Sequence, residues 1–143
     1  KVCGILTEMS TEMDYINYVV IGTGINVNQT EFPEEIRETA GSLKLAAGHS
    51  IARAELAAAI MEELENLYGI FLKTEDLSAL KEEYNKNCVT CGHEIRVMEP
   101  GHEYTGTTDG INDSGELVVK KMDGENVCVY AGEVSVRGLY GYV

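Results

Sequence analysis

The chain has 143 residues, enough for one ordinary domain or two small ones, and its hydrophobic content of 44% is normal for a globular protein. Its formal charge of −13, from 11 basic and 24 acidic residues, argues against binding of nucleic acid or of an anionic membrane, which rely on lysine and arginine. We find no apolar run long enough to span a membrane and no signal peptide, so we expect a cytoplasmic protein with reduced cysteines.

The first third of the chain is predicted to contain a β-hairpin. Residues 2–9 and 18–27 are apolar almost throughout, which is typical of central strands that are buried on both faces. The polar connection between them is short, which favours antiparallel pairing.

Three helices are predicted after the hairpin. Pro33 favours a first helical turn, so a short helix is expected to run to about Thr39. A long helix is predicted over residues 51–72 with Ser50 as its N-cap, and another over residues 77–87. The apolar stripe expected to be buried on the long helix consists of Leu56, Ile60, Leu64, Leu67 and Phe71.

From Gly92 the helical periodicity stops, and short strands alternate with turns such as Asp123-Gly124. Five strands are predicted, over residues 94–98, 104–108, 116–122, 126–130 and 134–137. So many short strands in such a short segment indicate a small SH3-like β-barrel. The predicted fold class is therefore α+β, a partial mixed sheet with helices in residues 1–90 followed by an SH3-like barrel in residues 91–143.

Two glycines lie inside the second predicted strand, in Gly22-Thr23-Gly24. A dinucleotide-binding fingerprint would need a third glycine where Val27 stands, so that interpretation fails. Because glycine weakens strands, either the strand bulges here, or a ligand or another backbone approaches closely. Asn26 projects to the same face and could hold a polar ligand group there.

Lys1 and Gly4 flank the start of the first strand. A lysine at this place could stabilise a phosphate or a carboxylate. The alternative is an ordinary exposed lysine, which is the usual state of this residue type.

The four cysteines include one C-x-x-C pair, Cys88 and Cys91, with His93 two residues further on. A structural zinc site usually needs four ligands, and a second pair is missing. We therefore interpret the cysteines as small buried hydrophobic residues. A metal or redox protein that uses Cys88 and Cys91 is kept as one functional alternative.

Several segments resemble the biotin protein ligase family, also called biotin–[acetyl-CoA-carboxylase] ligase. Lys1–Glu8 has the form K-x-x-G-I-L-x-E, and Val20–Val27 has the form V-I-G-x-G-I-N-V. The other matching segments follow in order: Phe32-Pro33, Ser42-Leu43, G-I-x-x-x-G at Gly110–Gly115 and G-E-V-S-V-R at Gly132–Arg137. The resemblance covers essentially the whole chain.

The resemblance implies an ATP- and Mg²⁺-dependent enzyme that forms biotinyl-5′-AMP and transfers biotin to a lysine of a biotin carboxyl carrier protein. Lys1 corresponds to the catalytic lysine, and no residue is implied as a metal ligand. The implied biotin-binding residues are Lys1, Gly4, Leu6, Gly22 and Gly24, and the implied nucleotide-binding residues are Asn26 and Arg137.

The resemblance also departs from the family pattern. The glycine- and arginine-rich loop of the family is absent, so we expect a fragment that is inactive alone, namely the C-terminal part of the catalytic domain plus the SH3-like domain. Unpaired strand edges would favour self-association, and a homodimer is left open. Asn112 stands where the family commonly has Asp, and Cys88 and Cys91 stand where it usually has other small residues. The alternative from another class is a non-catalytic module that binds the carrier protein or mediates dimerisation.

Overall fold

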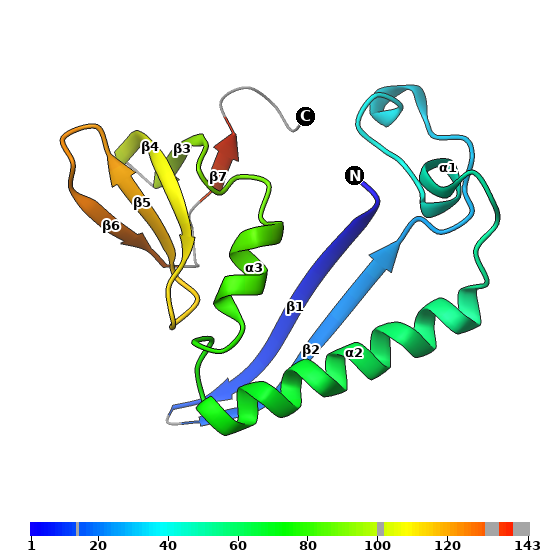
Figure 1. Cartoon of the computed structure of the whole chain (residues 1–143), viewed down its shortest axis with the longest axis horizontal. Coiled ribbons are helices and arrows are strands. Elements are labelled where there is room, and N and C mark those ends of the chain that lie inside the picture. The colour runs from blue at the N-terminus through cyan, green and yellow to red at the C-terminus, as the bar shows by residue number, and fades with distance from the viewer. Residues whose placement is uncertain (14, 100–101, 131–134, 139–143) are drawn as a thin grey trace. The chain divides into compact units, whose positions relative to one another are not determined.

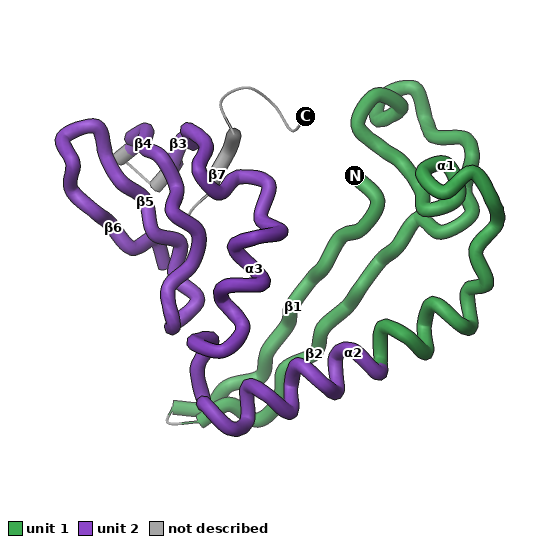
Figure 2. The backbone as a smooth tube through the Cα atoms, viewed as in Figure 1, with its two compact units in different colours: residues 1–61 green, residues 62–143 purple. Residues whose placement is uncertain are grey.

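The structure, a computed structural model, describes residues 1–13, 15–99, 102–130 and 135–138, with the backbone alone described for 99, 102 and 135–138 (Figure 1). Helices and antiparallel sheets are both present, so the predicted α+β class is confirmed. The chain divides into two compact units, residues 1–61 and 62–143, which are described separately below (Figure 2).

The predicted hairpin forms the sheet of the first unit. Strand β1 (Cys3–Glu12) pairs antiparallel with β2 (Tyr15–Ile25), and the register places Gly4 opposite Gly24 and Leu6 opposite Gly22. The prediction that both faces are buried is wrong for the described chain, because the sheet has only two strands there. Large apolar side chains that are about half or more exposed are Ile5, Leu6, Met9, Tyr15, Ile16, Tyr18, Val19, Val20 and Ile21.

The segment after the hairpin differs from the prediction. A single 3-10 turn, η1 (Glu34–Ile36), replaces the short helix that was expected to reach Thr39. The Gly41 N–H donates to the Lys1 carbonyl at 3.0 Å. This hydrogen bond holds the segment against the start of β1, and the helix does not continue. An unpredicted helix, α1 (Leu43–Ala47), follows; the buried Ser42 caps it by accepting a hydrogen bond from the Leu45 N–H at 3.2 Å.

Two further helices are close to their predicted ranges. Helix α2 spans Arg53–Thr74 and α3 spans Lys81–Asn87. Ser50 is not the N-cap of α2, because the carboxamide of Asn28 instead exchanges two hydrogen bonds with the main chain of Ile51, both at 2.9 Å. The stripe predicted as buried on α2 is only partly covered, with Leu56, Ile60 and Phe71 half-buried and Leu64 and Leu67 exposed. None of the described helices is both long and apolar enough to cross a membrane.

The five predicted strands of the second unit form one antiparallel sheet in the order β6-β5-β4-β3-β7. Their bounds are β3 Glu94–Glu99, β4 His102–Ile111, β5 Leu117–Lys121, β6 Asn126–Val129 and β7 Ser135–Gly138. Val134, where the last strand was predicted to begin, lies outside the described residues. The core of the sheet consists of Ile95, Val97, Val119 and Val129, with Tyr104 and Leu117 packed against it.

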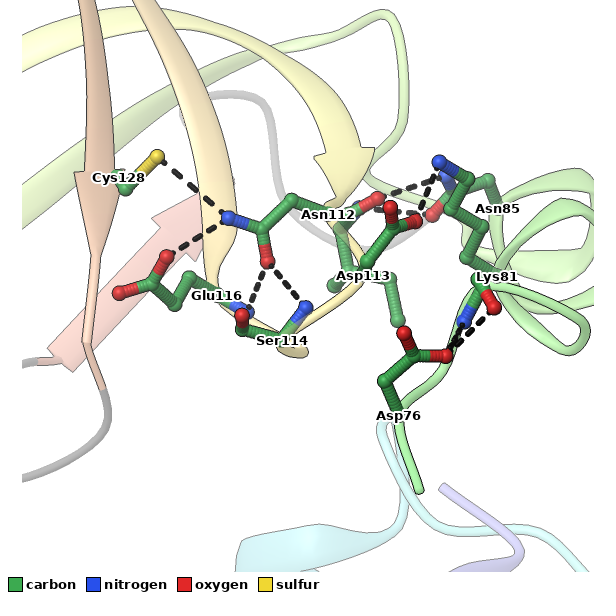
Figure 3. Close-up of polar contacts among 10 residues, drawn as sticks. Asp76, Lys81, Asn85, Asn112, Asp113, Ser114, Glu116 and Cys128 are labelled. Carbon is green, nitrogen blue, oxygen red and sulfur yellow. Dashed lines mark hydrogen bonds and ion pairs between the residues drawn. The ribbon is translucent and has the colours of Figure 1, made fainter. Parts of the chain in front are cut away.

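Helix α3 is attached to the turn between β4 and β5 by polar contacts (Figure 3). The Asn85 carboxamide donates to the Ile111 carbonyl at 3.2 Å and accepts from the Ile111 N–H at 2.8 Å. Asp113 forms an ion pair with Lys81 at 2.5 Å, and its carbonyl accepts from the Leu77 N–H at 2.8 Å. The helix and the sheet therefore belong to one unit, and the side chain of Asn85 substitutes for a strand partner at the end of β4.

Candidate functional site

An open cavity of about 520 Å³ lies in the first unit, where the chain start, the end of β2 and the η1 segment meet. Four of the seven residues singled out from the sequence line it: Lys1, Gly4, Gly24 and Asn26. The other lining residues are Val2, Cys3, Ile25, Ile36, Thr39 and Ala40. One wall therefore comes from the hairpin and the other from a segment that is about forty residues away in the sequence.

The side chain of Lys1 lies over Gly4. A Cβ atom added to Gly4 would be 3.3 Å from Lys1 Cε, which is tighter than most real contacts, and 3.4 Å from Lys1 Nζ. The hydrogen bond from the Gly41 N–H to the Lys1 carbonyl fixes the backbone at this place. Among the described residues, none of the ion pairs involves the Lys1 ammonium, so its charge is available to an anion. A side chain at Gly4 would require the end of the Lys1 side chain to shift by a few tenths of an ångström.

The strand glycines are not explained by a bulge. The register of β1 and β2 is continuous from Cys3 to Ser10, and its one irregularity lies between Ser10 and Thr11. A Cβ atom at Gly22 or Gly24 would be 3.7 Å or 3.9 Å from the nearest backbone oxygen, which is ordinary contact. The described geometry therefore removes the bulge and leaves close approach of a ligand or of another backbone as the explanation for these glycines.

Asn26 holds the end of β2 against the segment that precedes α1. Its Nδ2 donates to the Gly41 carbonyl at 3.0 Å, its N–H donates to the Val2 carbonyl at 2.9 Å, and its carbonyl accepts from the Leu43 N–H at 3.0 Å. The side chain is half-buried, and its Oδ1 has no partner among the described residues. The amide thus both supports the cavity wall and retains one free acceptor.

Three lining residues, Ile36, Thr39 and Ala40, were not indicated by any sequence pattern. They reach the cavity because of the long-range hydrogen bond between Gly41 and Lys1, which no local pattern reveals. A second cavity of about 440 Å³ in the same unit is lined in part by Arg53, which no sequence pattern singled out.

In the part of the chain that the structure describes, no group of three or more His, Cys, Asp or Glu side chains is placed to hold a metal ion. Cys88 and Cys91 are free thiols.

Comparison with known proteins gives the family. Residues 90–137 match the model described as "Biotin protein ligase C terminal domain". The bifunctional ligase/repressor BirA of Bacillus subtilis strain 168 is 35% identical over 126 residues, which cover 87% of this chain and 38% of that protein. The biotin–[acetyl-CoA-carboxylase] ligase of Mycobacterium tuberculosis is 32% identical over 135 residues, which cover 94% of this chain and 47% of that protein. A solved structure of the biotin protein ligase from Aquifex aeolicus, in complex with biotin and ATP, superposes with a TM-score of 0.78 at 26% identity, over 96% of this chain and 56% of that one. The chain belongs to the biotin protein ligase family.

The resemblance inferred from the sequence is thereby confirmed, and the chain corresponds to the C-terminal portion of a biotin protein ligase. The sheet of the second unit matches the SH3-like fold of these ligases. The chain spans less than half the length of the two curated relatives, 38% and 47%.

The remaining residues implied by the ligase resemblance are placed as follows. Leu6 and Gly22 face each other one step beyond the Gly4–Gly24 pair on the same side of the hairpin, and Leu6 is exposed. Arg137 lies in β7 of the second unit, where its backbone is paired with Arg96, and its side chain is outside the described residues.

Proposed function

We propose that this chain supplies part of the biotin and nucleotide site of an ATP-dependent biotin protein ligase. The enzyme forms biotinyl-5′-AMP and transfers biotin to a lysine of a biotin carboxyl carrier protein in the cytoplasm. The observation that carries the proposal is the gathering of Lys1, Gly4, Gly24 and Asn26 around one cavity. The relative from Aquifex aeolicus, which was solved with biotin and ATP, supports these ligands for the family.

Lys1 is the proposed catalytic residue. Its ammonium lies at the cavity and has no carboxylate partner in the described part of the chain. A fixed positive charge at this place would bind the biotin carboxylate and the α-phosphate, and would offset the negative charge that develops during adenylation. Loss of one such electrostatic contact typically lowers kcat by about 10²–10³-fold.

The glycines are proposed to make room for the bicyclic ring of biotin. Gly4 and Gly24 are directly opposite each other, with Gly22 and Leu6 as the next pair on the same face, so the four residues form one continuous strip. Asn26 would contact the nucleotide through its free Oδ1, and Arg137 is proposed to act at the nucleotide end.

The two-domain division into residues 1–90 and 91–143 and the inactivity of this chain alone are part of the same proposal. The resemblance also implies Mg²⁺, but the described residues contain no cluster that fits a metal ion. Our proposal therefore assigns none of them to the metal and derives no step through it.

The test uses the ligase that contains this sequence and measures biotin-dependent exchange between ATP and pyrophosphate, which reports adenylation. Gly4→Val should lower the exchange rate at least tenfold, because its side chain displaces Lys1 and fills the strip. Gly69→Ala in α2 is the matched control, since a Cβ atom there meets nothing within 4 Å. Equal exchange rates for the two variants would contradict the assignment of the hairpin face to biotin.

A further inference from the structure

The C-x-x-C pair is not used by the proposed ligase site, and its geometry differs from that of the other two cysteines. Cys88 is the C-cap residue of α3, and a turn leads from it through Cys91 to β3. The Cys91 N–H donates to the Cys88 carbonyl at 3.0 Å, which closes the turn. Both thiols are half-buried, whereas Cys3 and Cys128 are exposed.

This hydrogen bond brings the Cα atoms of the two cysteines close to the separation that a disulfide requires. A turn closed from its first to its fourth residue keeps the two Cα atoms within about 7 Å. A disulfide requires about 4.4–6.8 Å between Cα atoms. Cys88 and Cys91 are the first and fourth residues of the turn, so the separation of their Cα atoms is compatible with a bridge.

The turn is also anchored to the sheet. The Gly92 N–H donates to the Thr108 carbonyl at 2.7 Å, and the Thr108 N–H donates to the His93 carbonyl at 3.2 Å. A second turn, closed by the His93 N–H and the Thr90 carbonyl at 3.0 Å, overlaps the first. Gly92 has a φ of 76°, a left-handed conformation that glycine adopts without strain. The anchoring holds the backbone of the turn, and with it the Cα atoms of the two cysteines, in place in the folded chain.

Cys88 is the member of the pair that lines a cavity. Cys88 lines an open, mainly apolar cavity of about 560 Å³ in the second unit, together with Tyr84 and Val89, whereas Cys91 does not. The Cys88 Sγ lies 3.3 Å from the Thr90 Oγ1, and this hydroxyl can donate to the sulfur once it is a thiolate. The cavity favours Cys88 as the thiol that a small reagent reaches first, with Cys91 as the second thiol.

We propose that Cys88 and Cys91 form a reversible redox pair that exchanges with low-molecular-weight disulfides. The Cys88 thiolate attacks a small disulfide, so a mixed disulfide forms and one small thiolate leaves. The Cys91 thiolate then attacks the Cys88 sulfur, and the second small thiolate leaves as the internal disulfide forms. The two protein thiols lose two protons and two electrons, and the small disulfide is reduced to two thiols.

The test uses the double variant Cys3→Ser, Cys128→Ser, which removes only exposed thiols and leaves the pair. After incubation with oxidised glutathione, intact mass spectrometry should show a loss of two hydrogens and no adduct, and thiol titration should fall from two to zero. Dithiothreitol should restore both thiols. Persistence of glutathione adducts, or of two free thiols, in the folded double variant would overturn the proposal.

A further variant separates the roles of the two thiols. With Cys91→Ser added, the mixed disulfide cannot resolve, and one glutathione per chain should remain on Cys88. Peptide mapping of the unaltered chain after alkylation should identify the Cys88–Cys91 bridge without any substitution. A bridge that links Cys3 or Cys128 in place of the pair would also refute the proposal. The ligase reaction is not involved in either measurement, so this inference stands or falls independently of the proposed function.

Discussion

Substitution of Gly110 by alanine is expected to destabilise the second unit strongly. Gly110 follows the register shift in β4 and has a φ of 93°, where an L-residue costs about 1–2 kcal/mol. An added Cβ atom would also collide with the Asn85 carboxamide, which makes two hydrogen bonds to the main chain of Ile111. Their loss costs about 1 kcal/mol each. The total is about 3–4 kcal/mol in the free energy of unfolding.

The assay is urea unfolding followed by far-UV circular dichroism. Gly124→Ala is the matched control, because Gly124 has a φ of 91° but a Cβ atom there meets nothing within 4 Å; it should cost only the backbone part, about 1–2 kcal/mol. In an Asn85→Ala background, Gly110→Ala should fall to the same smaller cost, since the collision is gone. If Gly110→Ala costs as much in that background as in the unaltered chain, the role assigned to Asn85 is wrong.

Three other changes have definite expected outcomes. Gly106→Ala should lower the stability by about 1–3 kcal/mol in urea unfolding, because its Cβ atom would be 2.6 Å from a backbone oxygen of β5 that cannot move aside. Asn112→Asp replaces an amide that donates to the Glu116 carboxylate at 2.7 Å with a second carboxylate, so about 1 kcal/mol or more of the free energy of unfolding should be lost at pH 7. Urea unfolding at pH 7 and at pH 4 should show a smaller loss at pH 4, because acid protonates one of the two carboxylates. The hydrogen bond that the Lys121 ammonium donates to the Glu125 carboxylate raises the pKa of Lys121. The stability from this pair is therefore present below the ordinary lysine pKa and is lost as the pH rises through the raised value. In an NMR titration Glu125→Gln should return the Lys121 pKa toward its ordinary value, and an unchanged pKa would refute the cause.

The strands of the second unit could be predicted because their signals are local. The turn at Asp123-Gly124 is closed by its own residues: the Glu125 N–H donates to Asp123 Oδ1 at 3.0 Å, and Gly124 adopts a positive φ. The same holds for the next turn upstream, where Asn112 Oδ1 accepts from the Ser114 N–H at 3.0 Å (Figure 3). Residues at such turns specify their own conformation, so spacing and composition are sufficient to find them.

The helix starts show where local signals fail. Ser50 has the chemistry of an N-cap, but Asn28, more than twenty residues upstream, binds the main chain of Ile51, and α2 begins only at Arg53. Helix α1 has five residues, which is too short for a hydrophobic period to be recognised. Both outcomes depend on contacts between segments that are distant in the sequence.

In the candidate site, too, local patterns predicted one wall and long-range contacts determine the other. Lys1 and Gly4 are close in sequence, and the alternation of a strand places Asn26 on the face of Gly24, so their proximity was predictable. The opposite wall was not, because it depends on the hydrogen bond from Gly41 to Lys1. Spacing alone also left the reason for the glycines open, and only the observed register removed the bulge as an explanation.

The hairpin is the element in which the apolar sequence pattern and the observed exposure of the side chains differ most. Its apolar residues lie on both faces, which is typical of a strand covered by a layer on each side, yet Ile5 and Leu6, neighbours that point to opposite faces, are 69% and 65% exposed. Apolar surface that is left in water gains none of the roughly 25 cal/mol per Å² that burial would supply. The pattern therefore specifies contacts that the described residues do not provide. This agrees with a chain that spans only 38% and 47% of its curated ligase relatives, and it explains why the strands were predicted correctly while their burial was not.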